Sequence, residues 1–187
     1  MDQGILTWVV DHRTPWLDHL AFFLKDVGQS PVSVVAVAMA TLIATFRTRQ
    51  WAWGLGMVLA ASGAIVASAL AKAIVQRPRP PVDDALVVAH GWSMPSSVAM
   101  LCAALGVALV AGWDTGGRPH QRSSIAIVVG VAALFGWAVV YLGAHWASDV
   151  IVGWALGAAI GAASVAVARP VVADVRRRRR RRAGATG

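Results

Sequence analysis

The chain has 187 residues, of which 57% are hydrophobic and only 14% are charged, and its formal net charge is +8 at pH 7. Together with a mean hydropathy of +0.62, these values exclude an ordinary soluble globular domain and indicate one polytopic domain of membrane helices. The single cysteine, Cys102, excludes an internal disulfide. Its place in an apolar run predicts an inert packing role.

The N-terminal part, residues 5–27, mixes apolar side chains with charged ones and is interrupted at Pro15. This pattern is typical of a broken amphipathic helix in the membrane interface, or of a sixth, poorly apolar span. We favour the interface and assign residues 1–30 to an N-terminal interfacial segment. Since residues 1–10 lack a basic start and a small-residue cleavage site, we expect no secretory signal peptide there.

Five apolar segments follow, each near the length that crosses a hydrocarbon core. They are Pro31–Phe46, Trp51–Val75, Pro95–Ala111, Ser124–Leu142 and Ser148–Ala168. We therefore expect an all-α fold, a polytopic membrane bundle of five to six helices, with its membrane domain over residues 31–170. Gly153, Gly157 and Gly161 recur every fourth residue in the last segment, which predicts a groove where another helix packs closely.

Arginines occur in two linkers, residues 47–50 and 113–122, and in an unbroken run from Arg176 to Arg182. If the segments alternate, all of them lie on one side, which the positive-inside rule makes cytoplasmic. We expect a bacterial cytoplasmic (inner) membrane and a basic cytoplasmic tail over residues 171–187, whose arginine run contacts anionic headgroups. Because the run directly follows an apolar helix, we expect no nucleic-acid partner.

Polar groups from three separate parts of the chain fall on the opposite, outer side: Lys72 with Arg77 and Arg79, Pro95 to Ser97, and His145 with Asp149. His145 and Asp149 are four residues apart where an apolar helix begins, so both lie on one helix face. The carboxylate can fix the imidazole tautomer, as a nucleophilic histidine requires. Alone, the histidine could simply cap the helix, and each cation could extend to the interface. Their convergence beside a helix N-terminus favours a phosphate site.

These residues resemble a known family, the type 2 phosphatidic acid phosphatases, which are membrane lipid-phosphate phosphatases related in fold to vanadium haloperoxidases. The family pattern is K-x(6)-R-P, then P-S-G-H, then S-R-x(5)-H-x(3)-D. The stretch from Lys72 to Arg79-Pro80 matches the first part completely. Pro95-Ser96 matches the start of the second part, and His145 with Asp149 matches the end of the third.

The resemblance implies a role for each matching residue. Lys72 and Arg79 would hold the phosphate oxygens, while Ser96 and the amide of Ser97 would add hydrogen bonds. His145 would attack phosphorus to give a phosphohistidine, Asp149 would orient it and balance its charge, and water would then release phosphate. No cofactor and no metal are expected, since the sequence has no carboxylate cluster and its histidines lack ligand spacing.

Two positions depart from the family pattern. The histidine that protonates the leaving group is replaced by Val98, and the Ser-Arg pair is replaced by Ala138-Val139. A positioned general acid contributes roughly 10²–10⁴-fold, or about 3–5 kcal/mol of barrier. One charge-stabilising donor contributes about 3–4 kcal/mol. His90 is a candidate replacement acid, although an ordinary surface histidine is the simpler interpretation.

The sequence therefore predicts an outward-facing lipid phosphate or diphosphate phosphatase with a weakened site. Diphosphates such as polyprenyl diphosphate should be favoured, because a phosphate leaves without the proton that a lipid alkoxide needs. The alternative is a catalytically silent membrane protein of the same fold, a pseudoenzyme that binds a lipid phosphate. A third interpretation, an unrelated transporter, predicts ionisable residues within the spans, and the segments nearly lack them.

Overall fold

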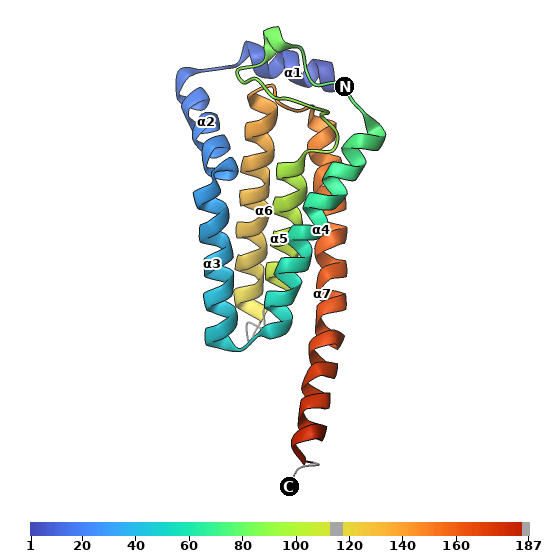
Figure 1. The fold of residues 1–187 in the computed structure, drawn as a ribbon. Coiled ribbons are helices and arrows are strands. Elements are labelled where there is room, and N and C mark those ends of the chain that lie inside the picture. Colours follow the sequence, from blue (N-terminus) through green and yellow to red (C-terminus); the bar gives the residue numbers. More distant parts are fainter. Residues whose placement is uncertain (113–117, 185–187) are drawn as a thin grey trace.

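The computed structural model describes residues 1–112 and 118–184, with side chains except at residues 118–121, 176 and 178–184. Over these residues the chain is all helical (Figure 1). The elements are α1 (Asp2–Asp11), α2 (Pro15–Gln29), α3 (Pro31–Thr48), α4 (Trp51–Val75), the 3-10 helix η1 (Val82–Asp84), α5 (Ser97–Gly112), α6 (Arg118–Tyr141) and α7 (Ala147–Gly184). The prediction of an all-α polytopic membrane bundle is confirmed.

The five predicted apolar segments correspond to α3 through α7. Four of these helices are long and apolar enough to cross a membrane, and α5 is a shorter apolar helix. Most of their apolar surface faces outward: only 6% of the apolar window of α3 and 33% of that of α7 is buried inside the protein. Such continuous exposed apolar surface is expected of helices that face lipid. The protein is therefore an integral membrane protein.

Helix α5 lies inside the bundle and packs against α4, α6 and α7. A Cβ atom at Gly157 or Gly161 of α7 would collide with a backbone carbonyl of α5, and one at Gly153 with the carbonyl of Ser96, just before α5. The predicted close helix contact is therefore confirmed, and its partner is α5. This contact also brings the first turns of α5 and α7 together, where the Ser96 amide donates to the Asp149 carbonyl at 3.0 Å.

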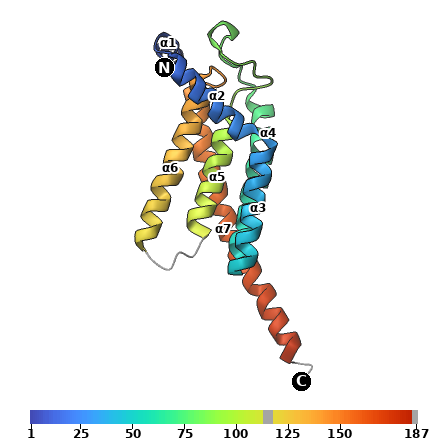
Figure 2. The same ribbon diagram turned by 90° about the vertical axis from the view of Figure 1, so that its left-hand side faces the viewer.

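Residues 1–30 form two helices, and the chain breaks between them just before Pro15. Helix α1 lies across the end of the bundle, and α2 runs down beside α6 (Figures 1 and 2). The break between them is tied to the end of α6, because Arg13 donates to the Tyr141 carbonyl at 2.9 Å and the Tyr141 hydroxyl donates to Asp18 at 2.7 Å. Neither helix is among the candidate spans, and the interfacial assignment remains a prediction.

Helix α7 is longer than the segment that the sequence predicts. It continues past Pro170 to Gly184 and projects beyond the other helices (Figure 1). Proline removes one helical hydrogen bond, but the arginines that follow are good helix formers, so the helix persists into the tail. Residues 113–117 of the second arginine linker and residues 185–187 of the tail lie outside the described residues.

Candidate active site

The candidate site lies at the end of the bundle away from the C-terminus (Figure 1). After α4 the chain crosses this end as a loop, residues 76–96, before it enters α5. The loop is fastened to the turn between α6 and α7, since Leu86 donates its amide to the Leu142 carbonyl at 3.0 Å. The Trp146 indole also donates to the Pro78 carbonyl at 3.0 Å. The three sequence motifs therefore meet at one place.

His145 lies in the turn between α6 and α7, two residues before α7 begins, and not on the helix as its spacing from Asp149 suggested. The turn needs Gly143, which has a φ of +71° and no room for a side chain beside Ala85. The amide of His145 donates to the Val139 carbonyl at 3.2 Å. These contacts fix the backbone of His145, and its side chain is 7% exposed.

Asp149 is fully buried in the first turn of α7. Its Oδ2 accepts hydrogen bonds from the Ser93 hydroxyl at 2.5 Å and from the Trp146 amide at 2.9 Å. The same oxygen lies 3.5 Å from Nδ1 of His145, which has no hydrogen-bond partner. The predicted pair is thus brought together, and a distance of 3.5 Å without substrate does not rule out a catalytic role.

Arg79 lies on the other side of the imidazole. Its Nη1 is 3.4 Å from Nε2 of His145. A guanidinium group can only donate hydrogen bonds, so Nε2 is the unprotonated nitrogen and Nδ1 carries the proton toward Asp149. The lone pair of Nε2 therefore faces Arg79, the cation that is predicted to bind phosphate.

The two predicted phosphate-binding cations are held by backbone carbonyls. Arg79 donates to the carbonyls of Gly91, His90 and Ala144 at 3.0, 2.9 and 2.6 Å. Lys72, in the last turn of α4, donates to the Trp92 carbonyl at 2.7 Å. His90, the candidate acid, thus contacts Arg79 through its backbone. Residues 90–93 cover both cations.

Arg77 organises the site in a way that the sequence did not predict. Its Nη1 donates to Asp149 Oδ1 at 2.7 Å and to the Ser148 hydroxyl at 2.6 Å. Its Nη2 donates to Asp2 Oδ2 at 2.7 Å. Asp2 also accepts a hydrogen bond from the amide of Ser148 at 3.1 Å. Arg77 therefore neutralises the buried Asp149, and α1 holds Arg77 in place.

The electrostatics of the site favour a neutral His145. Burial lowers the pKa of this imidazole, and the adjacent charges of Arg79 and Lys72 lower it further. The contact with the negatively charged Asp149 opposes them, but the net pKa lies below the ordinary 6.5. Burial lowers the pKa of Arg77, but its contacts with Asp2 and Asp149 raise the pKa by more, so the net shift is upward.

Ser96 and Ser97 lie at the start of α5, beside Asp149. The fully buried Ser96 caps the helix, with its hydroxyl 3.5 Å from the Ala99 amide. The Ser97 hydroxyl pairs with that of Ser68 in α4 at 2.6 Å. Both hydroxyls therefore already have protein partners, and a role in phosphate binding remains a prediction.

The two positions that depart from the motifs lie in one place. Val139 is 4% exposed and forms an apolar cluster with Ala99 and Val150, and Val98 packs against this cluster. Since the Val139 carbonyl also accepts the His145 amide, the cluster lies directly beside the histidine. Two polar groups expected near the phosphate have been replaced together by apolar packing.

Comparison with known proteins agrees with this fold. The model of the PAP2 superfamily matches residues 51–172, and the chain belongs to this superfamily. Among solved structures, it is similar to the first transmembrane PAP2-type phosphatidylglycerolphosphate phosphatase from Bacillus subtilis, with a TM-score of 0.79 and 25% identity over 91% of this chain and 85% of that one.

A second solved structure, LpxE from Aquifex aeolicus, has the same fold, with a TM-score of 0.71 and 24% identity over 87% of this chain and 93% of that one. No curated protein sequence matches the chain. The resemblance drawn from the three motifs is confirmed at the level of the family. The matched residues start at α4, so α1, which supplies Asp2, lies outside them.

Proposed function

We propose that the protein is a lipid phosphate phosphatase that works through a phosphohistidine on His145, at the outward-facing end of the bundle. The observation that carries the proposal is the placement of His145, with Nε2 toward Arg79 and Nδ1 toward Asp149. The similarity to a phosphatidylglycerolphosphate phosphatase supports the same class of substrate. A C-terminus in the cytoplasm follows from the arginine distribution.

In the first step, Nε2 attacks the terminal phosphorus of the lipid, an N–P bond forms and the bond from phosphorus to the leaving oxygen breaks. The leaving group takes the electron pair, while Asp149 stabilises the positive imidazole ring. Water then attacks phosphorus, the N–P bond breaks, and inorganic phosphate leaves with the oxygen of the water. His145 returns to its neutral form, and the second proton of the water passes to solvent.

Substrate binding must change the loop over the cations. Arg79 and Lys72 donate to carbonyls of residues 90–93, so phosphate oxygens have to replace these acceptors. Charge-assisted hydrogen bonds to phosphate are stronger than those to a neutral carbonyl, which favours the exchange. We therefore infer that residues 90–93 move when the lipid headgroup enters.

Val98 leads to a prediction about the substrate. Its apolar packing supplies no proton to a leaving group, so we expect phosphate release from polyprenyl diphosphate to be faster than from a lipid monophosphate such as phosphatidic acid. The expected ratio of kcat/KM is at least ~10², the lower value of a general acid. Phosphate release by purified protein in mixed micelles measures it, and equal rates for both classes would contradict it.

Restoring the acid separates an enzyme from a silent binding protein. Val98→His should raise monophosphate hydrolysis by about 10-fold or more, with a smaller effect on diphosphates. The control Val98→Asn is polar but cannot act as a general acid, so it should not raise the rate.

We leave Val139→Arg for a second step, because it places a charge in a buried apolar cluster. If the parent and Val98→His both release no phosphate, the result favours the lipid-phosphate-binding alternative.

The ionisation of His145 can be measured without substrate. Because burial and two nearby cations lower its pKa, the imidazole should gain its proton only below pH 6.5, and the nucleophilic form should predominate at neutral pH. Nitrogen NMR of the histidine side chains in detergent micelles gives the midpoint, with His145→Gln to assign the signal. A midpoint above pH 6.5 would contradict this prediction, because it would mean that Asp149 raises the pKa of His145 by more than burial and the two cations lower it.

A further inference from the structure

A cavity lined by arginines, tryptophans and small apolar residues lies at the opposite end of the bundle from His145. It has a volume of about 470 Å³ and opens between the turn from α3 to α4, the end of α5 and α7. The residues that carry the argument are Arg49, Trp51, Trp53, Arg169, Ala173 and Arg177. The mechanism proposed for His145 does not use any of them.

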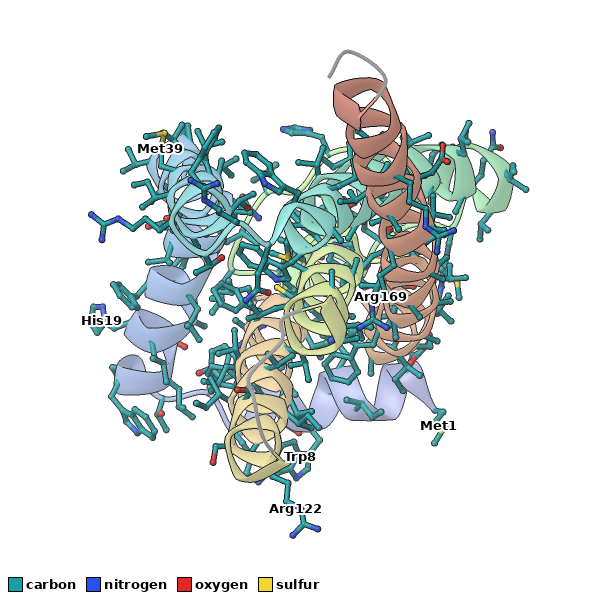
Figure 3. All side chains as sticks on the ribbon, turned by 90° about the horizontal axis from the view of Figure 1, so that it is seen from below. Met1, Trp8, His19, Met39, Arg122 and Arg169 are labelled. Atoms are coloured by element: carbon teal, nitrogen blue, oxygen red, sulfur yellow. The ribbon has the colours of Figure 1, made fainter. Side chains whose placement is uncertain are left out.

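Three arginine side chains line the cavity and give it positive charge. Arg169, Ala173 and Arg177 are spaced by four residues and follow one face of α7. Arg169 donates to the Ala111 carbonyl at 2.7 Å, in the last turn of α5, where helix carbonyls lack helical partners. Seen from this end, Arg169 lies between α5 and α7 (Figure 3). Among the described residues that line the cavity, none is acidic.

The depth of the cavity matches the membrane boundary. Trp51 is the first residue of a candidate span, and Arg169 is the first charged residue of α7 after Asp149. Tryptophans at span ends are typical of the level of lipid headgroups. A ligand here would have its charged group among arginines and any apolar chain against the exposed sides of the spans.

We propose that this cavity binds the phosphate group of an anionic phospholipid from the surrounding bilayer. The guanidinium group of arginine can donate two parallel hydrogen bonds to phosphate oxygens. Basic cavities between the ends of membrane helices bind such headgroups. This is a site for one lipid, distinct from the diffuse attraction of lipids to the arginine run. Free phosphate shares the same chemistry, and the experiment separates the two.

Native mass spectrometry of full-length protein, released from vesicles of phosphatidylglycerol and phosphatidylcholine, tests the site. We expect one phosphatidylglycerol to stay bound to the parent. The double substitution Arg49→Gln and Arg169→Gln should weaken retention by at least ~10-fold. Ala173→Trp should also reduce it, because the indole fills the cavity while every arginine remains. The matched control Arg47→Gln, an exposed arginine outside the lining, should bind like the parent.

Equal retention by the parent, the cavity variants and the control would overturn the proposal. So would displacement of the lipid by millimolar inorganic phosphate, because the site would then recognise free phosphate. If the double substitution impairs folding, Ala173→Trp alone decides, and unchanged lipid retention by that variant rejects the site. Phosphate release at His145 should be the same in all these variants when measured in phosphatidylcholine micelles.

Discussion

Substitution of His145 by alanine should reduce phosphate release from a lipid diphosphate by at least ~10³-fold, to the background of the assay. The variant has no nitrogen to attack phosphorus, and no other described histidine is placed between Arg79 and Asp149. The fold should persist, since the side chain of His145 makes one contact at 3.4 Å and one at 3.5 Å. Phosphate release and thermal unfolding in detergent measure the two effects.

The matched control for this variant is His19→Ala, which removes an exposed histidine on α2 that points away from the bundle (Figure 3). It should keep the parental rate. If His145→Ala retained a tenth of the parental activity while His19→Ala was unchanged, the nucleophile would have to be another group.

Substitution of Asp149 by asparagine should lower both activity and stability. Asp149 is fully buried, and its charge is balanced by Arg77 at 2.7 Å. Breaking a buried ion pair costs about 3–5 kcal/mol of folding free energy. The rate should also fall by roughly 10²–10⁴-fold, because an amide neither fixes the Nδ1–H tautomer as firmly nor stabilises the positive ring. Unfolding and phosphate release in one detergent measure both.

Asp2→Asn is the comparison that tests the role of Arg77. It removes the Asp2 carboxylate that pairs with Arg77 but leaves the ion pair between Arg77 and Asp149. We expect a smaller loss of rate than with Asp149→Asn, because Asp2 acts only by positioning Arg77 and Ser148. If Asp149→Asn were as stable and as active as the parent, the buried charge would have no function in this site.

Much of the fold follows from the apolar runs. The predicted segment Trp51–Val75 coincides with α4, because a run of that length can satisfy its backbone in lipid only as a helix. The first residues of the predicted segment Pro95–Ala111 instead precede α5, since Ser96 caps the helix. The predicted segment Ser148–Ala168 ends before α7 does, because its limits follow the apolar run and the helix continues through the residues after it.

Sequence predicted the part of the site whose residues belong to the family motifs. The spacing of Lys72, Arg79, His145 and Asp149 follows a family pattern, so sequence was sufficient to group them. Asp2 gave no such signal, because its contact with Ser148 joins positions 146 residues apart in the chain. The shared cluster of Val98 and Val139 is equally a product of tertiary packing, and only the structure shows that the two positions lie side by side.

The most direct test is to trap the phosphorylated protein. Purified protein is mixed with a lipid diphosphate that carries ³²P in its terminal phosphate, quenched in base within milliseconds and digested. We predict an acid-labile label on the peptide that contains His145, formed and lost at rates consistent with phosphate release. Phosphate release without label on His145, or with label on another residue, would contradict the proposed mechanism.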